Sequence, residues 1–290
     1  ILKNGSKGKE VIKLQEFLDI DSDGHFGKGT EGAVKTWQAN NKLTVDGIVG
    51  PSTWNAMGLA STDVEESYYE TENCLKIHRH FLPAHEYMTG SNPEYIFLHH
   101  TAGWNNPFRT IDHWGRDSRG RIATEFVLGG QSVKGDDNKY DGVLVQCMPQ
   151  GGWGWHLGTG RSDMHQNSVG IEVNNFGWIK DGKTYAGTSA DDLQIVTLDQ
   201  PFRGHKTWHR YSDKQIEVLR DWIIWIGERD NIDIRAGLPT LIKTIGVDAF
   251  EYIPEVLRGK CKGLWTHTNV RKDKSDMFPQ PELMDMLVSL

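Results

Sequence analysis

Two distant segments of this 290-residue chain carry side chains that could share one metal ion. Residues 97–102 (FLHHTA) include His99, and residues 267–276 (HTNVRKDKSD) begin with His267 and end with Asp276. Neutral imidazole and carboxylate are good zinc ligands, and three protein ligands with one open position are typical of a hydrolytic site. Between these segments, residues 168–173 (SVGIEV) can place the carboxylate of Glu172 at the end of a strand. The set therefore predicts a reaction as well as a fold.

Strand geometry favours His99 over the neighbouring His100 as the first ligand. Residues 95–98 are a short apolar run that suits a buried strand ending at His99. Successive side chains of a strand point to opposite faces, so only one of the two histidines can face the site. His267 follows another plausible strand end at residues 263–265, and a loop can bring Asp276 to the same metal. Each histidine alone is more often structural, so the prediction depends on the whole set.

The composition limits the classes of protein to which the chain can belong. With 37% hydrophobic and 24% charged residues, it is typical of a soluble globular protein that is large enough for two domains. The formal net charge of -7 argues against a nucleic-acid-binding surface. No uncharged apolar run approaches the length of a membrane span, so we expect no membrane insertion. As a separate expectation, we favour a monomer.

The start of the chain and its cysteines bear on the cellular setting. No basic, apolar and small-residue progression opens the sequence, so we expect no export signal. The chain begins at Ile1 rather than Met, which leaves a removed leader as the alternative. Three widely spaced cysteines without a CxxC pair favour buried free thiols over a disulfide framework or a cysteine-rich zinc site. These are Cys74, Cys147 and Cys261.

The first segment contains an internal repeat with the pattern DGxxGxxT. It occurs at residues 23–30 and again at residues 46–53, where Asp-Gly and Gly supply tight turns and the threonine can cap a helix. Apolar residues at helical spacing predict helices over residues 10–18 and 30–40, and Pro51 favours the start of a third. The sequence therefore predicts a small all-α unit of three helices over residues 1–58.

Residues 1–58 resemble the three-helix peptidoglycan-binding domain family. The shared positions include Val11, Leu14 and Gln15 before the first turn and Trp37-Gln38 before the second. The resemblance implies binding of glycan or stem peptide at the bacterial wall, and it makes Trp37 a weak candidate for that contact. The alternative is a helical domain that is held by its repeated turns and has no ligand.

A linker and a larger domain follow. Residues 59–85 lose periodicity and begin with an acidic stretch that includes Asp63, Glu65 and Glu66, which predicts a linker to a domain over residues 86–290. Strands are predicted at residues 95–98, 123–128, 142–147 and 168–173, and helices at residues 107–114 and after the capping box at Ser212. The fold class is therefore a small all-α domain plus an α/β domain with a mixed central sheet and flanking helices.

The larger domain resembles the zinc-dependent type 2 N-acetylmuramoyl-L-alanine amidase family, which includes animal peptidoglycan recognition proteins. The resemblance covers about residues 93–290. It depends on residues 97–102, 155–158 (WHLG), 168–172 (SVGIE) and 274–276 (KSD). It implies that Zn²⁺ is the cofactor and that its ligands are His99, His267 and Asp276.

The same resemblance assigns roles to residues around the metal. Glu172 is expected to be the general base that orients and deprotonates water, and Lys274 is expected to stabilise the developing oxyanion. Trp155 and His156 match the family's Trp-His segment and are weaker candidates for substrate contacts, together with Thr124.

The sequence departs from the family pattern in three places. Thr124 stands where several relatives have a catalytic tyrosine, so proton transfer falls on Glu172. The stretch from Asn174 to Gly263 is longer than one crossover helix requires; we favour a larger scaffold, and a lid or substrate-contacting insertion is the alternative. The loop over residues 151–156 is rich in Gly and Trp, and it can either form a groove wall for a sugar or simply pack.

Together these features predict a modular peptidoglycan hydrolase that cleaves the amide between N-acetylmuramic acid and L-alanine of the stem peptide. A recognition protein that does not cut is less favoured because all three candidate ligands are present, and a zinc peptidase because there is no HExxH motif. The domain order resembles a bacteriophage endolysin, made in the host cytoplasm and acting on the wall after release. A secreted or periplasmic bacterial remodelling amidase is the alternative.

Overall fold

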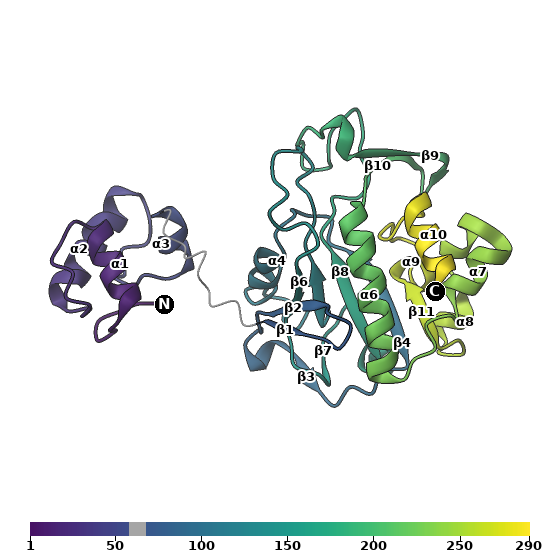
Figure 1. Cartoon of the computed structure of the whole chain (residues 1–290), viewed down its shortest axis with the longest axis horizontal. Helices are drawn as coiled ribbons and strands as arrows, with labels where there is room; N and C mark the ends of the chain where they lie inside the picture. The colour runs from purple at the N-terminus through teal and green to yellow at the C-terminus, as the bar shows by residue number, and fades with distance from the viewer. Residues whose placement is uncertain (58–67) are drawn as a thin grey trace. The chain divides into compact units, whose positions relative to one another are not determined.

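The computed structural model describes residues 1–57 and 68–290, which belong to two compact units (Figure 1). The acidic residues 59–67 of the predicted linker lie outside the described residues. None of the helices in the described part of the chain combines the length and the apolar composition that a membrane crossing requires.

The smaller unit consists of three helices, as the sequence predicted. They are α1 (Lys9–Phe17), α2 (Lys28–Asn40) and α3 (Pro51–Ala56). Helical spacing directs one apolar face of each of the two longer helices inward. The resulting core is formed by Val11, Leu14, Phe26, Val34, Val49 and Met57.

Two buried glutamines explain the repeated DGxxGxxT pattern. The Gln15 amide nitrogen donates to Asp23 Oδ1 (2.8 Å), the His25 carbonyl and Thr30 Oγ1, and the Gln15 amide oxygen accepts from the Gly24 N–H. Gln38 makes the same four contacts in the second repeat, with Asp46, Gly47, Ile48 and Thr53. A buried amide is tolerated only when its polar atoms are paired, so each repeat is a turn built around one glutamine.

The larger unit is built on a seven-stranded mixed sheet. In spatial order the strands are β1 (Tyr68–Glu70), β2 (Lys76–Arg79), β6 (Leu144–Gln146), β5 (Phe126–Leu128), β8 (Ser168–Val173), β4 (Tyr95–His100) and β11 (Gly263–Thr266). The neighbours β5, β8, β4 and β11 run parallel, whereas β6 is antiparallel to β5 and β1 is antiparallel to β2. This is the mixed central sheet predicted from the sequence.

The sheet begins earlier in the chain than the sequence indicated. Residues 68–85 were assigned to the linker, but β1 and β2 lie within them, and β2 pairs with β6. The linker interpretation is therefore wrong for these residues. Strands this short carry little periodicity, so pairing of β1 with β2 and of β2 with β6 decides their structure.

Helices cover both faces of the sheet. Val127 and Val145 pack with Ile111 of α4 (Pro107–Trp114) on one face. Phe126 precedes Val127 in β5 and points to the opposite face, where it packs against Trp222 of α6 (Asp213–Asp230). This helix starts at the predicted Ser212 capping box. The remaining helices are α5 (Ser162–Gln166), α7 (Leu238–Ile245), α8 (Pro254–Leu257), α9 (His267–Val270), α10 (Pro281–Ser289), η1 (Ala84–Glu86), η2 (Asp192–Gln194) and η3 (Gly246–Phe250).

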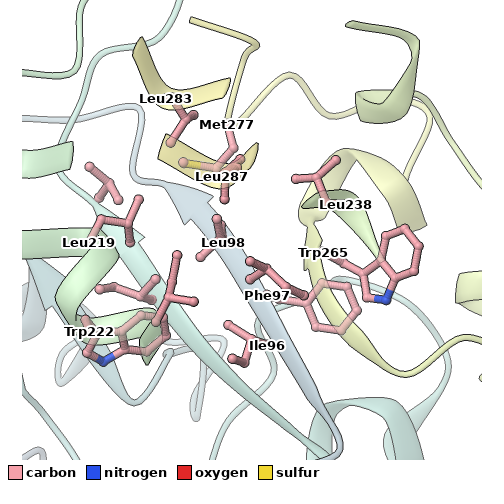
Figure 2. Packing of buried hydrophobic residues seen from close by; sticks show 14 of the residues in the cluster. Ile96, Phe97, Leu98, Leu219, Trp222, Leu238, Trp265, Met277, Leu283 and Leu287 are labelled. Atoms are coloured by element: carbon pink, nitrogen blue, oxygen red, sulfur yellow. The ribbon is translucent and has the colours of Figure 1, made fainter. Parts of the chain in front are cut away.

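The core holds β4 rigidly between these layers. Tyr95–His100 is buried along its whole length. Figure 2 shows Leu98 close to Leu219 and Phe97 beside Trp265 of β11. A strand that is packed on both faces gives the histidine at its end a fixed position.

Most of the long stretch from Asn174 to Gly263 is scaffold. It contains the hairpin of β9 (Ile195–Phe202) and β10 (His205–His209), followed by α6, α7 and α8. Its aromatic residues Trp208, Trp222 and Phe250 are fully buried. This agrees with the larger-scaffold interpretation for the greater part of the segment.

Two other sequence expectations concern packing. Within the Gly- and Trp-rich loop, β7 (Gly152–Trp153) pairs with β3 (Met88–Thr89), and the indole of Trp153 donates to the Thr89 carbonyl (3.2 Å). The loop therefore packs in this region. All three cysteines are free, but only Cys147 is fully buried and Cys74 is exposed, so the expectation of buried thiols is wrong for Cys74.

Candidate functional site

The candidate site lies where three parallel strands end. Thr266 of β11 pairs with Leu98 of β4, and His99 of β4 pairs with Glu172 of β8. Paired residues of neighbouring strands project to the same face, so His99 and Glu172 point the same way. His267 directly follows β11 as the first residue of α9. Parallel strands gather chemistry at their carboxyl ends, and the sheet does so here.

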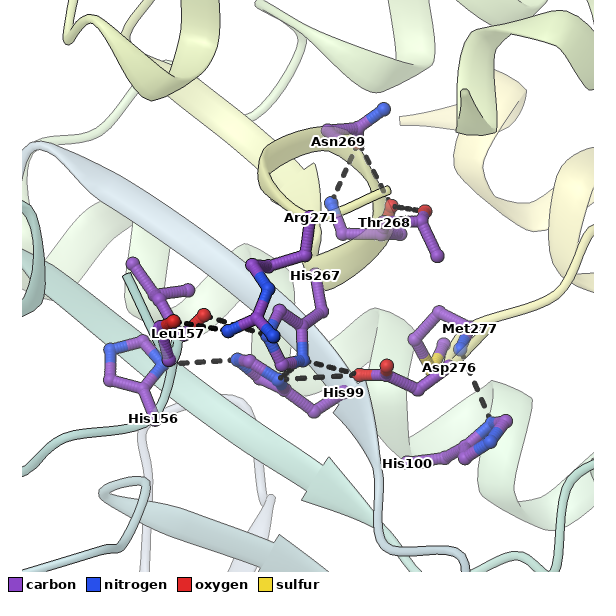
Figure 3. Close-up of polar contacts among 12 residues, drawn as sticks. His99, His100, His156, Leu157, His267, Thr268, Asn269, Arg271, Asp276 and Met277 are labelled. Carbon is purple, nitrogen blue, oxygen red and sulfur yellow. Dashed lines mark hydrogen bonds and ion pairs between the residues drawn. The ribbon is translucent and has the colours of Figure 1, made fainter. Parts of the chain in front are cut away.

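His99, His267 and Asp276 converge on one point (Figure 3). The Nδ1 atoms of the two histidines are 3.1 Å apart, and Asp276 Oδ2 lies 2.9 Å from His267 Nδ1 and 3.4 Å from His99 Nδ1. Zinc–ligand distances of about 2.0–2.2 Å place tetrahedral ligand atoms about 3.3–3.6 Å apart. One of the three separations lies in this range and the other two are shorter by about 0.2–0.4 Å, so a small outward shift of the side chains would let them share one zinc-sized cation.

The charge state of this trio also suits a dication. Burial lowers the pKa of His99 to about 4, so its imidazole is neutral near pH 7 and keeps a lone pair for a metal. Burial disfavours the charged form of Asp276, but the neighbouring His267 and His99 outweigh it and hold the pKa of this carboxyl well below its usual range. The imidazole of His99 and the carboxylate of Asp276 are therefore suitable zinc donors.

The outer nitrogens of both histidines are hydrogen-bonded, which fixes the orientation of the rings. His267 Nε2 donates to the Leu157 carbonyl (2.9 Å). His99 Nε2 lies 3.0 Å from His156 Nδ1, His156 Nε2 lies 2.9 Å from Ser168 Oγ, and Ser168 Oγ donates to the His165 carbonyl (3.2 Å). One consistent assignment has each N–H or O–H donating to the next group in this chain. Such partners fix the tautomer of metal-binding histidines.

His100 points away from the trio, as strand alternation predicts. Its Nδ1 accepts hydrogen bonds from the Tyr211 hydroxyl (2.7 Å) and from the Met277 N–H (3.2 Å). Met277 follows Asp276 and has a left-handed φ of 58°. His100 therefore anchors the turn that carries the third ligand. Left-handed backbone at a non-glycine residue is a strain that clusters at functional sites.

Glu172 has the environment of a proton-transfer group. Its Oε2 is buried and has no hydrogen-bond partner among the described residues. Burial and the nearby Asp276 raise the pKa of this carboxyl well above its usual value, and Lys274 acts in the opposite direction. A carboxyl with a raised pKa in a cavity is a candidate general base.

A cavity of about 360 Å³ brings these groups together. Glu172, Lys274, His267 and Asp276 line it, together with the predicted substrate contacts Thr124 and His156. Thr124 is buried, and its hydroxyl donates to the carbonyl of Phe126 (2.7 Å), the first residue of β5, so this strand holds the side chain in place. The arrangement has the parts needed for hydrolysis of an amide: a metal-binding trio, a base and a cation.

Comparison with known families gives this site a chemical class. Residues 89–276 match the family described as N-acetylmuramoyl-L-alanine amidase, and these residues are well over half of the chain. The chain belongs to this amidase family. Residues 7–57 of the amidase match a second family, described as a putative peptidoglycan binding domain. The two matches together make peptidoglycan the substrate class of this amidase.

Solved structures of several similar proteins are known. The amidase is 35% identical to a Burkholderia AP3 phage endolysin over 22% of this chain, with a TM-score of 0.20, and the match spans 26% of the endolysin's length. It is 15% identical to the amidase LysC from Clostridium intestinale URNW, covering 73% of this chain and 95% of that one, with a TM-score of 0.40. It is 13% identical to PlyL, covering 66% and 80%, with a TM-score of 0.38.

The two tryptophans among the predicted substrate contacts of the amidase have different positions in the fold. Trp155 packs edge-on against Trp153 and His165, and within residues 68–290 it is not among the lining residues of the 360 Å³ cavity. Trp37 belongs to the smaller unit, where it contacts Phe17. The structure therefore brings His156 and Thr124 to the cavity and leaves Trp155 out of its lining, and the predicted contact of Trp37 with the wall stays a prediction.

Sequence reasoning missed the groups behind the ligands. Ser168 lies on the same strand face as Gly170 and Glu172, so alternation along the predicted strand could have identified it. Gly170 is required by space, since a Cβ there would lie 3.0 Å from His156 Nδ1 and 2.8 Å from a Thr124 methyl carbon. No sequence signal marked His165 or the Leu157 carbonyl, because both are brought to the site by tertiary folding.

Proposed function

We propose that this amidase uses Zn²⁺ to cleave the amide between N-acetylmuramic acid and L-alanine of the stem peptide. The observation that carries the proposal is the convergence of His99 and His267, 168 residues apart, with Asp276. Their ligand atoms lie within 4.8 Å of one another beside the unpaired carboxyl of Glu172. Bound zinc supplies Lewis acidity, which polarises a carbonyl and acidifies water.

The protein's own groups have separate roles in this proposal. Glu172 accepts a proton from the attacking water through its free Oε2 and delivers it to the nitrogen of the leaving L-alanine. Lys274 lines the same cavity and stabilises the negative charge that develops on the carbonyl oxygen. His156 holds the ring of His99 in place through its hydrogen bond.

The smaller unit is proposed to keep the enzyme on its insoluble substrate. Its match to a putative peptidoglycan binding domain supports this role, in which Trp37 is one candidate contact. Linking a binding module to a catalytic one raises the local concentration of substrate without any new contact in the catalytic site.

The proposed setting is the cell wall of a bacterial host. We propose that the chain acts as an endolysin, made in the host cytoplasm and released onto the wall at lysis. The secreted remodelling amidase that was the alternative from the sequence uses the same reaction.

Mass spectrometry of digested peptidoglycan tests the reaction. The full chain is expected to release stem peptides that begin with free L-alanine, to leave the glycan strands intact, and to lose this activity with a chelator. Glu172→Gln is expected to keep zinc and lose turnover, whereas the exposed control Glu217→Gln is expected to match the wild type. Cleavage of a glycosidic bond, or activity that a chelator leaves unchanged, would overturn the proposal.

A further inference from the structure

A second, larger cavity continues from the metal-binding one. It has a volume of about 740 Å³, within the range of about 300–1,000 Å³ that is typical of ligand sites. Both cavities are lined by Thr101, Ala102, Trp114 and Glu172. They therefore meet at the candidate base and form two arms of one groove.

Two exposed aromatic rings form a wall of the larger arm. Trp104 is 49% exposed and Tyr185 is 58% exposed, and both line this cavity, so their rings are accessible to a ligand. Both rings pack against the buried Phe176, with centroids 5.0 Å and 6.2 Å from it. We call Trp104 and Tyr185 the aromatic platform.

Hydrogen bonds fix the backbone around the platform. The Asn174 side-chain amide donates to the carbonyl of Trp104. The Tyr185 hydroxyl donates to the carbonyl of Ala102 (2.7 Å), a residue with a left-handed φ of 50° just beyond the ligand strand β4. The platform is therefore attached directly to the segment that follows His99, and its rings are held in place before any ligand arrives.

The two arms differ in chemistry. Around the platform, the larger arm offers amides and both signs of charge from Asn105, Asn106, Arg109, Asp137 and Lys139. A pyranose ring has an apolar face that can stack on an aromatic ring, and hydroxyl and acetamido groups at its edge that need such partners. The smaller arm also carries charged groups, Arg119, Asp273 and Lys274, which suit a peptide with carboxylates, but the rings of the aromatic platform line only the larger arm.

We propose that the larger arm is a saccharide subsite, in which sugar rings of the glycan strand next to the cleaved N-acetylmuramic acid lie on Trp104 and Tyr185. The stem peptide then occupies the smaller arm. This inference rests on the proposed function and identifies which part of the substrate each arm holds. It also gives the loop around Tyr185, within the long 174–263 stretch, a substrate contact that the scaffold interpretation did not include.

Kinetics on two soluble substrates of the full chain test the subsite. One is N-acetylmuramic acid carrying a tetrapeptide, and the other is a tetrasaccharide fragment of the glycan with the same stems. Trp104→Ala and Tyr185→Ala are expected to raise KM for the tetrasaccharide at least about fivefold while changing KM for the monosaccharide less than about twofold. Trp104→Phe and Tyr185→Phe keep a ring and are expected to recover most of the loss. Phe81→Ala, a control with 48% exposure outside the groove, is expected to behave as wild type.

The outcomes separate this inference from the function on which it rests. If the wild type cleaves neither substrate, the proposed amide hydrolysis fails. If the wild type cleaves both and the alanine variants keep the tetrasaccharide KM, or raise both KM values equally, the saccharide subsite is wrong. If the rise in KM caused by Trp104→Ala depended on the length of the stem peptide, the larger arm would hold the peptide. That result would also overturn the saccharide subsite.

Discussion

His156 illustrates how one imidazole can set the orientation of another. The sequence marked it as a possible substrate contact, yet its Nδ1 lies against His99 and its Nε2 against Ser168. Burial lowers the pKa of His156 well below its usual value, so the ring is neutral and can accept from one neighbour while it donates to the next. The main contact of His156 is therefore with the candidate zinc ligand His99, although His156 also lines the smaller arm of the groove.

We predict that His156→Ala weakens zinc binding by about 10–100-fold, because partners of this kind tune ligand orientation and basicity. Competition with a chromophoric chelator measures the affinity. The exposed His85→Ala serves as the control. Unchanged affinity in His156→Ala would show that the hydrogen bond to His99 has no part in metal binding.

The pH dependence of the reaction should report on Glu172. A general base must be deprotonated, so activity is lost as the pH falls through its pKa, which burial and Asp276 raise. Lys274 lowers this pKa, so Lys274→Met should let it rise and move the acidic limb of the kcat/KM profile to higher pH, with a lower plateau. Lys272→Met, two residues away, is the matched control. An acidic limb that stays in place in Lys274→Met would contradict this account.

At the level of elements, the sequence predicted best where patterns are long or chemistry is local. The limits of β8 and α4 agree with the prediction, and alternation along β4 correctly separated His99 from His100. Pairing of β11 with β4 joins residues far apart in the chain, and no local pattern contains that information. The same holds for β2, a strand of four residues whose structure depends on β6.

A buried ion pair joins the end of α6 to the sheet. Arg229 donates to both carboxylate oxygens of Glu125 (2.8 and 3.0 Å), just before β5, and both side chains are almost fully buried. Gln146 donates to the same carboxylate (2.9 Å). The network fixes the middle of the sheet, at β5 and β6, against the longest helix of the larger unit.

We predict that Arg229→Ala lowers the free energy of unfolding by about 3–5 kcal/mol, because it leaves Glu125 buried without a countercharge. Urea unfolding of the full chain, followed in the larger unit by tryptophan fluorescence, measures the change. Arg220→Ala on the same helix removes an exposed ion pair and should cost less than about 1 kcal/mol. Equal effects of the two substitutions would mean that the buried pair contributes no more than a surface pair.

In the whole molecule, the match to a putative peptidoglycan binding domain and the match to an amidase fall in different units of the chain. The residues of the candidate catalytic site all come from residues 68–290, which have their own core. We predict that a chain of residues 68–290 cleaves a soluble muropeptide at the rate of the full chain but degrades insoluble wall more slowly. Parallel assays on the two substrates measure this. Equal rates on insoluble wall would show that residues 1–57 add nothing to wall degradation.

The proposed chemistry requires that one cation be shared by His99, His267 and Asp276. Isothermal titration of zinc into the metal-stripped full chain measures this sharing directly. The wild type and the exposed control Asp285→Ala are expected to bind one zinc ion per chain tightly, and His267→Ala and Asp276→Ala are expected to lose this site. Zinc binding of undiminished stoichiometry and affinity in His267→Ala and Asp276→Ala would contradict the account.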